Sequence, residues 1–436
     1  MNRTVAFHTL GCKVNQYDSQ AMLELFREAG YTAVPFSAQA GVYVINTCTV
    51  TGTGDKKSMQ AARRIRRDHP DSALILCGCL AQRMGEKLLH ETGATLVLGT
   101  QRRAEIVRLL ERALSANSPI CAVDPLPDGT PYESLRVHSQ DEHTRAVMKI
   151  QEGCSNRCTY CIIPSVRGPI RSRTPDDIRL EAAALAEAGF SEIVLTGIHL
   201  TSYGRDLNGL HLLDAIRCVH DTQGIARIRL GSLEPTVATP DFIQALHGLP
   251  KVCPQFHLAL QSGCDTVLQR MARRYNMHMY MDAVQTIRDT YPLAALTTDV
   301  LTGFPGETED EHRITCDAIR RIGFARIHVF PFSAREGTRA AEMPGQLSRS
   351  VKERRVRELI AIGEETSRQY RSQWLGRVAE VLPEQHDEAG WHGYTDTYIP
   401  VTVPEHSLIP GQCVRVRLDS LTGDGMSGTP VTKEPV

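Results

Sequence analysis

Apolar runs alternate with amphipathic stretches over the first hundred residues of the chain. Helical patterns such as 19–30 and 58–70 separate short runs that have the length and composition of buried strands. These runs are 4–10, 41–46, 73–78 and 94–99. Strands that alternate with helices in this way form parallel sheets with helical crossovers. We therefore predict an N-terminal α/β domain with a parallel sheet over residues 1–117.

Residues 118–144 show no clear period and contain four prolines, which is typical of a linker. Beyond this segment, apolar runs return, with helical stretches between them. The six runs are 146–150, 192–197, 226–232, 255–260, 296–303 and 325–332. Repeated βα units of this kind predict an open or closed (β/α) barrel over residues 145–370. In such barrels the chemistry lies where the strands end.

The tail, residues 371–436, changes character after a charged helical stretch. Its short strand-like runs are separated by turns and show no helical period. This pattern predicts a small antiparallel β-barrel of the OB-like kind that often binds RNA. The fold class is therefore α/β, with a C-terminal β-barrel appended.

Composition and charge narrow the classes of partner. The formal net charge is −1, so any nucleic acid must be held by local basic patches. We find no signal peptide and no apolar stretch long enough to cross a membrane, so we expect a cytoplasmic protein with no membrane partner. The 13 cysteines are an odd number, which favours reduced thiols or metal ligands over a disulfide framework.

The strongest chemical signal is the stretch 151–168, "QEGCSNRCTYCIIPSVRG", directly after the first predicted barrel strand. It spaces Cys154, Cys158 and Cys161 as C-x3-C-x2-C. Three thiolates can hold a [4Fe-4S] cluster whose fourth iron stays open to a chelating substrate. The alternative is a zinc site, but zinc prefers four ligands and paired C-x2-C spacings.

With aromatic Tyr160 before the last cysteine, this triad resembles that of radical S-adenosylmethionine enzymes. The resemblance implies that the open iron binds the amino and carboxylate groups of S-adenosylmethionine, and that one electron splits the sulfonium to a 5′-deoxyadenosyl radical. It also implies that residues at the strand ends shape the cofactor pocket. Those residues are Tyr160, Gly197, Glu234, Gln261, Asp299 and Gly303. For each glycine, a tight βα turn is the alternative explanation.

A second cysteine group lies in the N-terminal domain. Cys12, Cys48 and Cys79 each follow a predicted strand, so a parallel sheet brings all three to one carboxyl edge. We predict a second metal site there, against the alternative of three unrelated buried thiols. Cys77 competes for the third position, but it ends an apolar run and we expect it to be buried. The other cysteines lack partners at ligand spacing, and we assign no role to Cys121, Cys218, Cys253, Cys264, Cys316 and Cys413.

The order of these modules resembles the methylthiotransferase family, and the likeness covers essentially the whole chain. It implies a second [4Fe-4S] cluster on Cys12, Cys48 and Cys79, and a C-terminal TRAM domain. The loops "TLGCKVNQYDSQ" and "NTCTVTGTGDKKS" resemble the branch that acts on N6-threonylcarbamoyladenosine at position 37 of tRNA, next to the anticodon. Gln20 departs from the glutamate that is common in the family, and we give it no chemical role.

The resemblance also implies the reaction and the partners. One S-adenosylmethionine methylates sulfur at the N-terminal cluster and a second is reductively cleaved, so that a methylthio group is inserted at C2 of the adenine ring. The partners are then a tRNA anticodon stem-loop and a reducing protein such as flavodoxin or ferredoxin. Alternative substrates are N6-isopentenyladenosine in tRNA and a ribosomal protein aspartate. A non-catalytic RNA-binding iron–sulfur regulator is the alternative from another class, and no general base can be named.

Three basic segments are candidates for RNA contacts. For the first segment below the alternative is a solvated helix face. For the second it is ion pairing with Asp176 and Asp177, and for the third it is the core of a small β-barrel. The segments comprise Arg63, Arg64, Arg66 and Arg67; Arg167, Arg171 and Arg173; and Arg415 and Arg417 with Trp391, Tyr394 and Tyr398.

Overall fold

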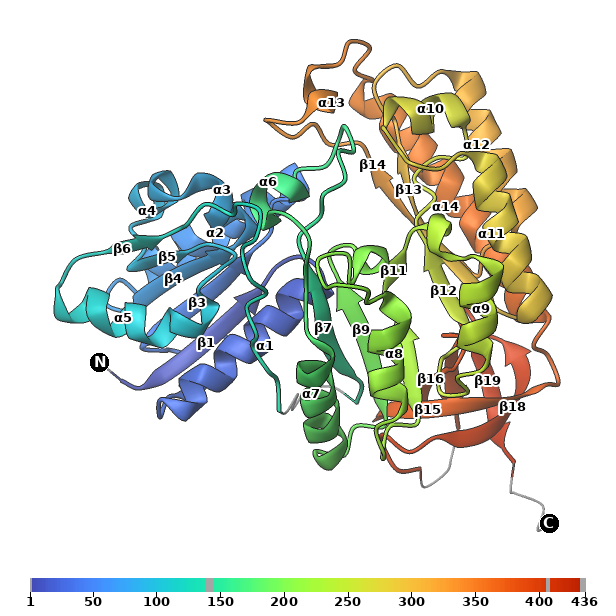
Figure 1. Ribbon diagram of the computed structural model, residues 1–436, viewed down its shortest axis with the longest axis horizontal. Coiled ribbons are helices and arrows are strands. Elements are labelled where there is room, and N and C mark those ends of the chain that lie inside the picture. Colours follow the sequence, from blue (N-terminus) through green and yellow to red (C-terminus); the bar gives the residue numbers. More distant parts are fainter. Residues whose placement is uncertain (1, 139–143, 405–407, 432–436) are drawn as a thin grey trace.

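The computed structural model describes residues 2–138, 144–404 and 408–431. Along the chain it contains a parallel α/β sheet, a partial (β/α) barrel and a small closed β-barrel (Figure 1). The carboxyl edge of the first sheet faces the partial barrel, and the small barrel packs at the lower end of the partial barrel in this view. The fold class predicted from the sequence is therefore confirmed.

The N-terminal sheet has six strands in the order β2-β1-β3-β4-β5-β6, and every neighbouring pair is parallel. Its strands are β1 (Thr4–Thr9), β2 (Thr32–Ala33), β3 (Val42–Thr47), β4 (Ala73–Gly78), β5 (Leu96–Leu98) and β6 (Ile120–Ala122). Its helices are α1 (Lys13–Glu28), α2 (Gly52–Asp68), α3 (Cys79–Met84), α4 (Glu86–Thr92) and α5 (Ile106–Ser115). The central strands β3 and β4 are buried along their whole length because helices cover both faces.

The partial barrel is built from six long parallel strands and two short ones. Its two four-stranded sheets have the orders β10-β9-β7-β8 and β11-β12-β13-β14. A single bridge between Ile228 and Val252 joins the sheets. The strands are β7 (Ala146–Glu152), β8 (Arg171–Ser172), β9 (Glu192–Gly197), β10 (Arg227–Leu230), β11 (Ser232–Leu233), β12 (Gln255–Leu258), β13 (Ala295–Thr302) and β14 (Arg326–Pro331).

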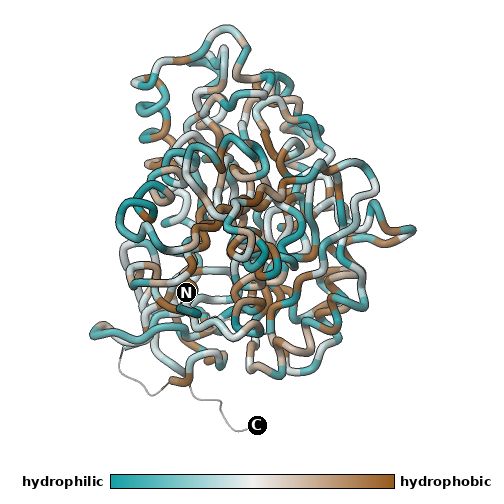
Figure 2. Tube along the Cα trace, turned by 90° about the vertical axis from the view of Figure 1, so that its left-hand side faces the viewer, coloured by the Kyte–Doolittle hydropathy of each residue, from teal (hydrophilic) through white to brown (hydrophobic). Residues whose placement is uncertain are grey.

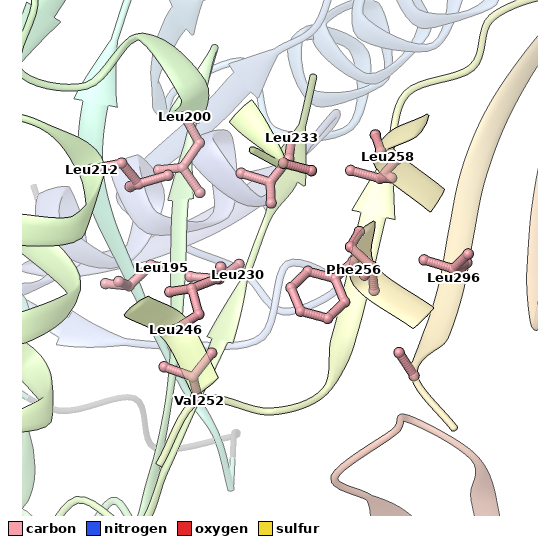
Figure 3. Close-up of a cluster of buried hydrophobic side chains, with 14 of the residues drawn as sticks. Leu195, Leu200, Leu212, Leu230, Leu233, Leu246, Val252, Phe256, Leu258 and Leu296 are labelled. Carbon is pink, nitrogen blue, oxygen red and sulfur yellow. The ribbon is translucent and has the colours of Figure 1, made fainter. Parts of the chain in front are cut away.

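Helices cover the outside of this barrel, and its core lies between them and the strands. Leu195, Leu230, Phe256 and Leu296 from neighbouring strands form one row of this core (Figure 3). The helices are α6 (Ile163–Arg167), α7 (Pro175–Glu187), α8 (Leu212–His220), α9 (Pro240–His247), α10 (Asp265–Arg270), α11 (Met277–Thr290), α12 (Glu309–Ile322), α13 (Arg339–Glu342) and α14 (Arg349–Ser372). All six strand runs predicted for this region are present.

Helix α14 runs from the barrel into the C-terminal domain, a closed barrel in the order β15-β16-β17-β19-β18. Its strands are β15 (Val378–Asp387), β16 (Gly390–Thr395), β17 (Pro400–Val403), β18 (Val414–Leu421) and β19 (Met426–Pro430). The predicted small barrel is thus present, with one difference: β17 pairs with β19 in parallel, so the barrel is mixed. No local sequence signal marks this closing pair.

The segment 118–144, expected to be a linker, contributes structure to the first sheet. Its residues 120–122 form β6, which pairs with β5. Farther along, the hydroxyl of Tyr17 donates to the carbonyl of Leu135 at 2.6 Å, and the hydroxyl of Tyr132 donates to that of Lys149 at 2.8 Å. The segment therefore packs along the boundary between the two α/β units. Residues 139–143 lie outside the described residues.

Hydropathy along the trace agrees with this layering. Apolar segments gather inside the molecule and hydrophilic ones lie at the periphery (Figure 2). Within residues 2–138, 144–404 and 408–431, no helix is both long enough and apolar enough to cross a membrane.

Candidate active site

The three cysteines predicted to hold the radical S-adenosylmethionine cluster, Cys154, Cys158 and Cys161, lie in the loop between β7 and α6. Gly153 begins the loop with φ +72°, and a Cβ there would lie 1.8 Å from the carbonyl oxygen of Pro169, so only glycine fits. The Cys154 N–H donates to the carbonyl of Gly168 at 3.0 Å, which closes the loop on itself. The loop thus has a fixed shape at the carboxyl end of the first barrel strand.

The three thiols of this loop lie close enough to influence one another electrostatically. Burial raises the pKa of Cys161 to about 12, and the charges of Cys158 and Cys154 act in the same direction. Burial also raises the pKa of Cys154, with Cys158 contributing. Thiols of this kind become thiolates when a metal binds them, and a donor set of three sulfurs fits an iron–sulfur cluster with one open iron.

Arg273 is a partner of this loop that no sequence pattern indicated. Its Nη1 donates to the Sγ of Cys158 at 3.2 Å, and its Nη2 donates to Glu234 at 2.8 Å. Glu234 also accepts from Asn156 at 3.2 Å and lies 3.1 Å from His199 Nε2. Burial alone would raise the pKa of Glu234, but the His199 hydrogen bond and the Arg273 charge hold it below its ordinary value. Glu234 therefore braces the cysteine loop.

The two glycines expected at the pocket have packing reasons of their own. A Cβ on Gly197 would lie 2.8 Å from the Cβ of Gln151 on the neighbouring strand β7. Gly303 has φ +73°, and a Cβ there would lie 2.5 Å from the side chain of Lys352. Close packing accounts for both glycines, and a role in binding a cofactor stays a prediction.

The remaining pocket candidates lie on or beside the carboxyl ends of the strands. Gln261 has φ +62° and bridges to β13, a conformation that is costly for a residue other than glycine. Asp299 on β13 faces His257, whose Nε2 lies 3.5 Å from its carboxylate. Tyr160 packs edge-on against Phe304, with ring centroids 6.4 Å apart. Their contact with S-adenosylmethionine stays a prediction.

The N-terminal cysteines also meet at one edge, as predicted from the strand order. Cys12 immediately precedes α1, Cys48 follows β3, and Cys79 begins α3 directly after β4. Gly11 has φ +113°, and a Cβ there would lie 3.2 Å from Cys48 Sγ. Burial raises the pKa of Cys79 to about 11, the Arg167 charge opposes this, and Cys12 and Cys48 add to it. The three thiols are therefore neighbours.

Cys77 and Cys79 are separated as expected. Cys77 on β4 is fully buried in the sheet core, and its Sγ lies 3.7 Å from the carbonyl of Ile45. Gly78 then turns the chain with φ +89°, so Cys79 lies at the edge, packed against Ile162 and Val166 of the next domain. Sulfur-only donors at this edge fit a second iron–sulfur cluster.

Arg167 joins the two cysteine regions. Although it was predicted to contact RNA, it is fully buried, and its Nε donates to Cys79 Sγ at 3.2 Å. Its Nη1 also contacts Glu152 at 2.9 Å and Asp18 at 3.2 Å. Arg103 and Lys149 contact the same two carboxylates. Five buried charges from both α/β units thus form one network.

The other arginines of this segment also lie inside the protein, which corrects the prediction of an RNA contact. Arg173 is fully buried and pairs with Asp177 at 2.7 Å and with Glu181. Arg171 is buried and donates to the carbonyl of Arg167 at 2.9 Å. The stretch is rich in cations because it must neutralise buried acids.

A similar correction applies to Tyr394 and Tyr398, expected to stack on RNA. Their rings stack on each other at 4.8 Å, and the guanidinium of Arg145 lies about equally close to both. Arg229 lies over the Tyr398 ring at 4.5 Å. The pair therefore serves the contact between the small barrel and the partial barrel. Trp391 packs against the core of the small barrel.

Two of the three predicted basic segments keep exposed cations. Arg63, Arg64 and Arg67 are exposed on α2, which follows the Cys48 loop. Arg66 of the same helix turns inward and donates to the carbonyl of Ser72 at 2.8 Å. On the small barrel, Arg415 and Arg417 are exposed. Arg417 pairs with Asp419 at 2.7 Å.

The Cys48 loop is tied to the far side of the partial barrel. Arg335, in the loop after β14, donates from Nη2 to the hydroxyl of Thr49 at 2.9 Å and contacts Asp55. The N–H of Gly52 donates to the hydroxyl of Ser333 at 3.3 Å. The N-terminal domain therefore contacts the barrel on both sides of the cysteine edge.

Two family models match the chain. The model described as "Uncharacterized protein family UPF0004" matches residues 4–99, and that of the radical SAM superfamily matches residues 148–319. The two matches coincide with the two cysteine groups.

Curated relatives match nearly the full length. The "Threonylcarbamoyladenosine tRNA methylthiotransferase MtaB" of Bacillus subtilis is 42% identical, over 95% of this chain and 93% of its own. The protein of the same name from Thermotoga maritima is 33% identical, over 97% and 96%. The "tRNA-2-methylthio-N(6)-dimethylallyladenosine synthase" of Moorella thermoacetica is 34% identical, over 95% and 96%.

Solved structures share the fold. The radical S-adenosylmethionine methyltransferase TsrM of Kitasatospora setae superposes with a TM-score of 0.58 at 14% identity, over 78% of this chain and 77% of that one. The cobalamin-dependent radical enzyme OxsB gives 0.52 at 10% identity, over 84% and 56%. At these identities the likeness concerns the architecture alone.

Proposed function

The chain belongs to the methylthiotransferase family of radical S-adenosylmethionine enzymes, and we propose that it converts N6-L-threonylcarbamoyladenosine beside the tRNA anticodon to the 2-methylthio derivative. The identity of 42% to a relative named for this substrate carries the proposal. The relative named for dimethylallyladenosine is 34% identical, so that nucleoside is the second candidate.

The reaction explains why two cysteine groups are needed. A cluster held by Cys154, Cys158 and Cys161 would supply the electron that splits S-adenosylmethionine to a radical, and a second cluster held by Cys12, Cys48 and Cys79 would provide the sulfur to be methylated. The C2–H of adenine is not acidic enough for a side-chain base to remove it, which makes radical abstraction the appropriate chemistry. The products are the 2-methylthio nucleoside, methionine, 5′-deoxyadenosine and S-adenosylhomocysteine.

The protein's own residues orient these groups. Arg273 donates a hydrogen bond to the sulfur of Cys158, and Glu234 fixes the guanidinium in place. Arg167 does the same for Cys79 from across the domain boundary. Each arginine also offsets the negative charge that thiolates bring into a buried site.

The N-terminal domain closes over the barrel beside both cysteine loops. Its contacts through Arg167 on one side and Arg335 on the other keep the two loops in a fixed relation. A target base in an unpaired tRNA loop can be turned out into such a site without opening a duplex. The exposed arginines of α2 are suited to hold the phosphate backbone. We expect a cytoplasmic reductant such as flavodoxin or ferredoxin to supply the electron for cleavage of S-adenosylmethionine.

Nucleoside mass spectrometry of tRNA tests the substrate. In a deletion strain without another enzyme of this activity, 2-methylthio-N6-threonylcarbamoyladenosine should disappear and its unmodified precursor should accumulate. Disappearance of the 2-methylthio derivative of N6-dimethylallyladenosine, which is the same nucleoside as N6-isopentenyladenosine, would instead select the second candidate. Unchanged tRNA together with an unmodified ribosomal protein aspartate would select the protein substrate.

A further inference from the structure

Three metal-ligating side chains converge on the outside of the barrel, away from both cysteine groups. His312 and Cys316 lie four residues apart on α12, so they share one face of that helix. Glu358 reaches them from α14. The Nε2 of His312 lies 3.0 Å from a carboxylate oxygen of Glu358 and 3.6 Å from Cys316 Sγ. All three ligand atoms lie within 4.8 Å of one another.

The helices hold these side chains firmly. Thr308 and Glu311 form a capping box that fixes the first turn of α12, where His312 lies. His312 and Cys316 are both buried, whereas the Glu358 side chain is about half exposed. The cluster thus has two ligands anchored between packed helices and one that faces solvent, which leaves an entry path for an ion.

The two separations from His312 Nε2 suit a tetrahedral ion. Zinc binds histidine nitrogen at about 2.0 Å and cysteine sulfur at about 2.3 Å, so tetrahedral angles place these two atoms roughly 3.5 Å apart. The observed separation of 3.6 Å matches this value. The same geometry places a nitrogen and a carboxylate oxygen roughly 3.3 Å apart, against 3.0 Å here.

We propose that His312, Cys316 and Glu358 form a zinc-binding site that links α12 to α14. An ion pair accounts for His312 and Glu358, and core packing accounts for the burial of Cys316, but neither requires the three ligand atoms to converge. A divalent ion accounts for all three. A water molecule then takes the fourth position, on the solvent side of Glu358.

The charges balance when zinc binds. The Cys316 thiol loses its proton to solvent, and the resulting thiolate and the Glu358 carboxylate together neutralise Zn²⁺. Arg354 lies 4.0 Å from Glu358 but pairs more closely, at 2.6 Å, with Glu309, so it does not occupy the carboxylate. Because α14 continues into the C-terminal barrel, the bound ion would strengthen the connection between the two barrels.

Zinc retention by the iron-loaded enzyme tests this site. After incubation with one equivalent of zinc and desalting, the protein should keep about one zinc per chain. X-ray absorption at the zinc edge should show one sulfur near 2.3 Å and nitrogen or oxygen at about 2.0–2.1 Å. This measurement is specific for the element, so the iron centres do not obscure it.

Substitutions show which side chains bind the retained zinc. Cys316→Ala should abolish retention, whereas Cys218→Ala, at another buried helical cysteine, should leave it unchanged. Glu358→Gln changes a half-exposed side chain to one of nearly equal size, and it should weaken zinc binding roughly tenfold or more. If Cys316→Ala does not fold, the exposed variant decides. Failure to retain zinc, a site with three sulfur ligands, or undiminished binding by Glu358→Gln would overturn the proposal.

Discussion

Arg167 of the barrel domain donates a hydrogen bond from Nε to Cys79 Sγ of the N-terminal domain across 3.2 Å. The donor is fully buried, and the bond crosses the boundary between the two α/β units. Arg273 makes the corresponding bond to Cys158, also at 3.2 Å. In each cysteine group, therefore, an arginine donates a hydrogen bond to one of the three thiols.

Arg167→Lys should keep the positive charge near Asp18 and Glu152 but remove the hydrogen bond to Cys79. Hydrogen bonds to ligand sulfur help set the potential of an iron–sulfur cluster. Because this bond favours the more negative, reduced state, its removal should shift the N-terminal cluster to a more negative potential. Redox titration followed by electron paramagnetic resonance, in a background without Cys154, Cys158 and Cys161, measures this shift.

Arg103→Lys is the matched control, because Arg103 contacts the same two carboxylates. Its third ion-pair partner is Glu133, another acid, so the variant should leave the potential unchanged. An equal shift in both variants would mean that the charge network sets the potential, and the Cys79 bond would lose its assigned role.

Arg273→Gln should lower reductive cleavage of S-adenosylmethionine roughly tenfold or more, because the substitution removes a supporting partner of a metal ligand. The assay is the yield of 5′-deoxyadenosine with dithionite as reductant. Arg274→Gln, at the exposed neighbouring position, should behave as the unmodified enzyme. Full activity of Arg273→Gln would contradict the positioning role.

Cys79→Ala should lower the iron content of the protein, whereas Cys77→Ala should leave it unchanged. If Cys79 is a ligand, its substitution should lower the content from about eight to about four iron atoms per chain, as expected for one remaining [4Fe-4S] cluster. Cys77 is buried in the sheet, so Cys77→Ala should keep about eight. Iron analysis after anaerobic reconstitution distinguishes the two, and a lower iron content in Cys77→Ala would reverse the ligand assignment.

The double variant Arg63→Gln, Arg64→Gln should weaken tRNA binding and reduce the slope of log K against log salt by about two, because each arginine neutralises one phosphate. Arg349→Gln, at an exposed arginine that begins α14, serves as the control. Binding titrations over a range of salt concentrations measure both quantities. Identical slopes for the two variants would remove α2 from the tRNA surface.

The sequence predicted most of the fold because its signals are local. Strand runs, their helical spacers and the three cysteines after β7 are each readable within about twenty residues. The meeting of Cys12, Cys48 and Cys79 was also predictable, because parallel strands place their ends at one edge. The parallel pair β17–β19 was not, since nothing local specifies which strands close a barrel.

The residues wrongly assigned to RNA contacts are held inside the protein by partners both near and far in sequence. The sequence suggests RNA contacts for Arg171, Arg173 and Tyr398, because cations and aromatic rings are common on surfaces that bind nucleic acid. Arg173 pairs with Asp177 and Glu181 a few residues farther along the chain, which is the alternative that the sequence offered, whereas Tyr398 contacts Arg229 from a distant segment. The same applies to Arg167 and Arg273, whose thiol partners are 88 and 115 residues away. Interactions of this range leave no periodic trace in one sequence.

The buried network around Asp18 has a consequence for the order of synthesis. Asp18 is 131 residues from Lys149 and 149 from Arg167, so it leaves the ribosome long before either cation exists. The N-terminal sheet is then complete in sequence while its central carboxylate lacks two of its three partners. Until the first barrel unit has been translated, Cys79 also lacks the cover of Ile162 and Val166. A nascent chain paused before this point would present its sulfur-rich edge to oxidants and stray metals.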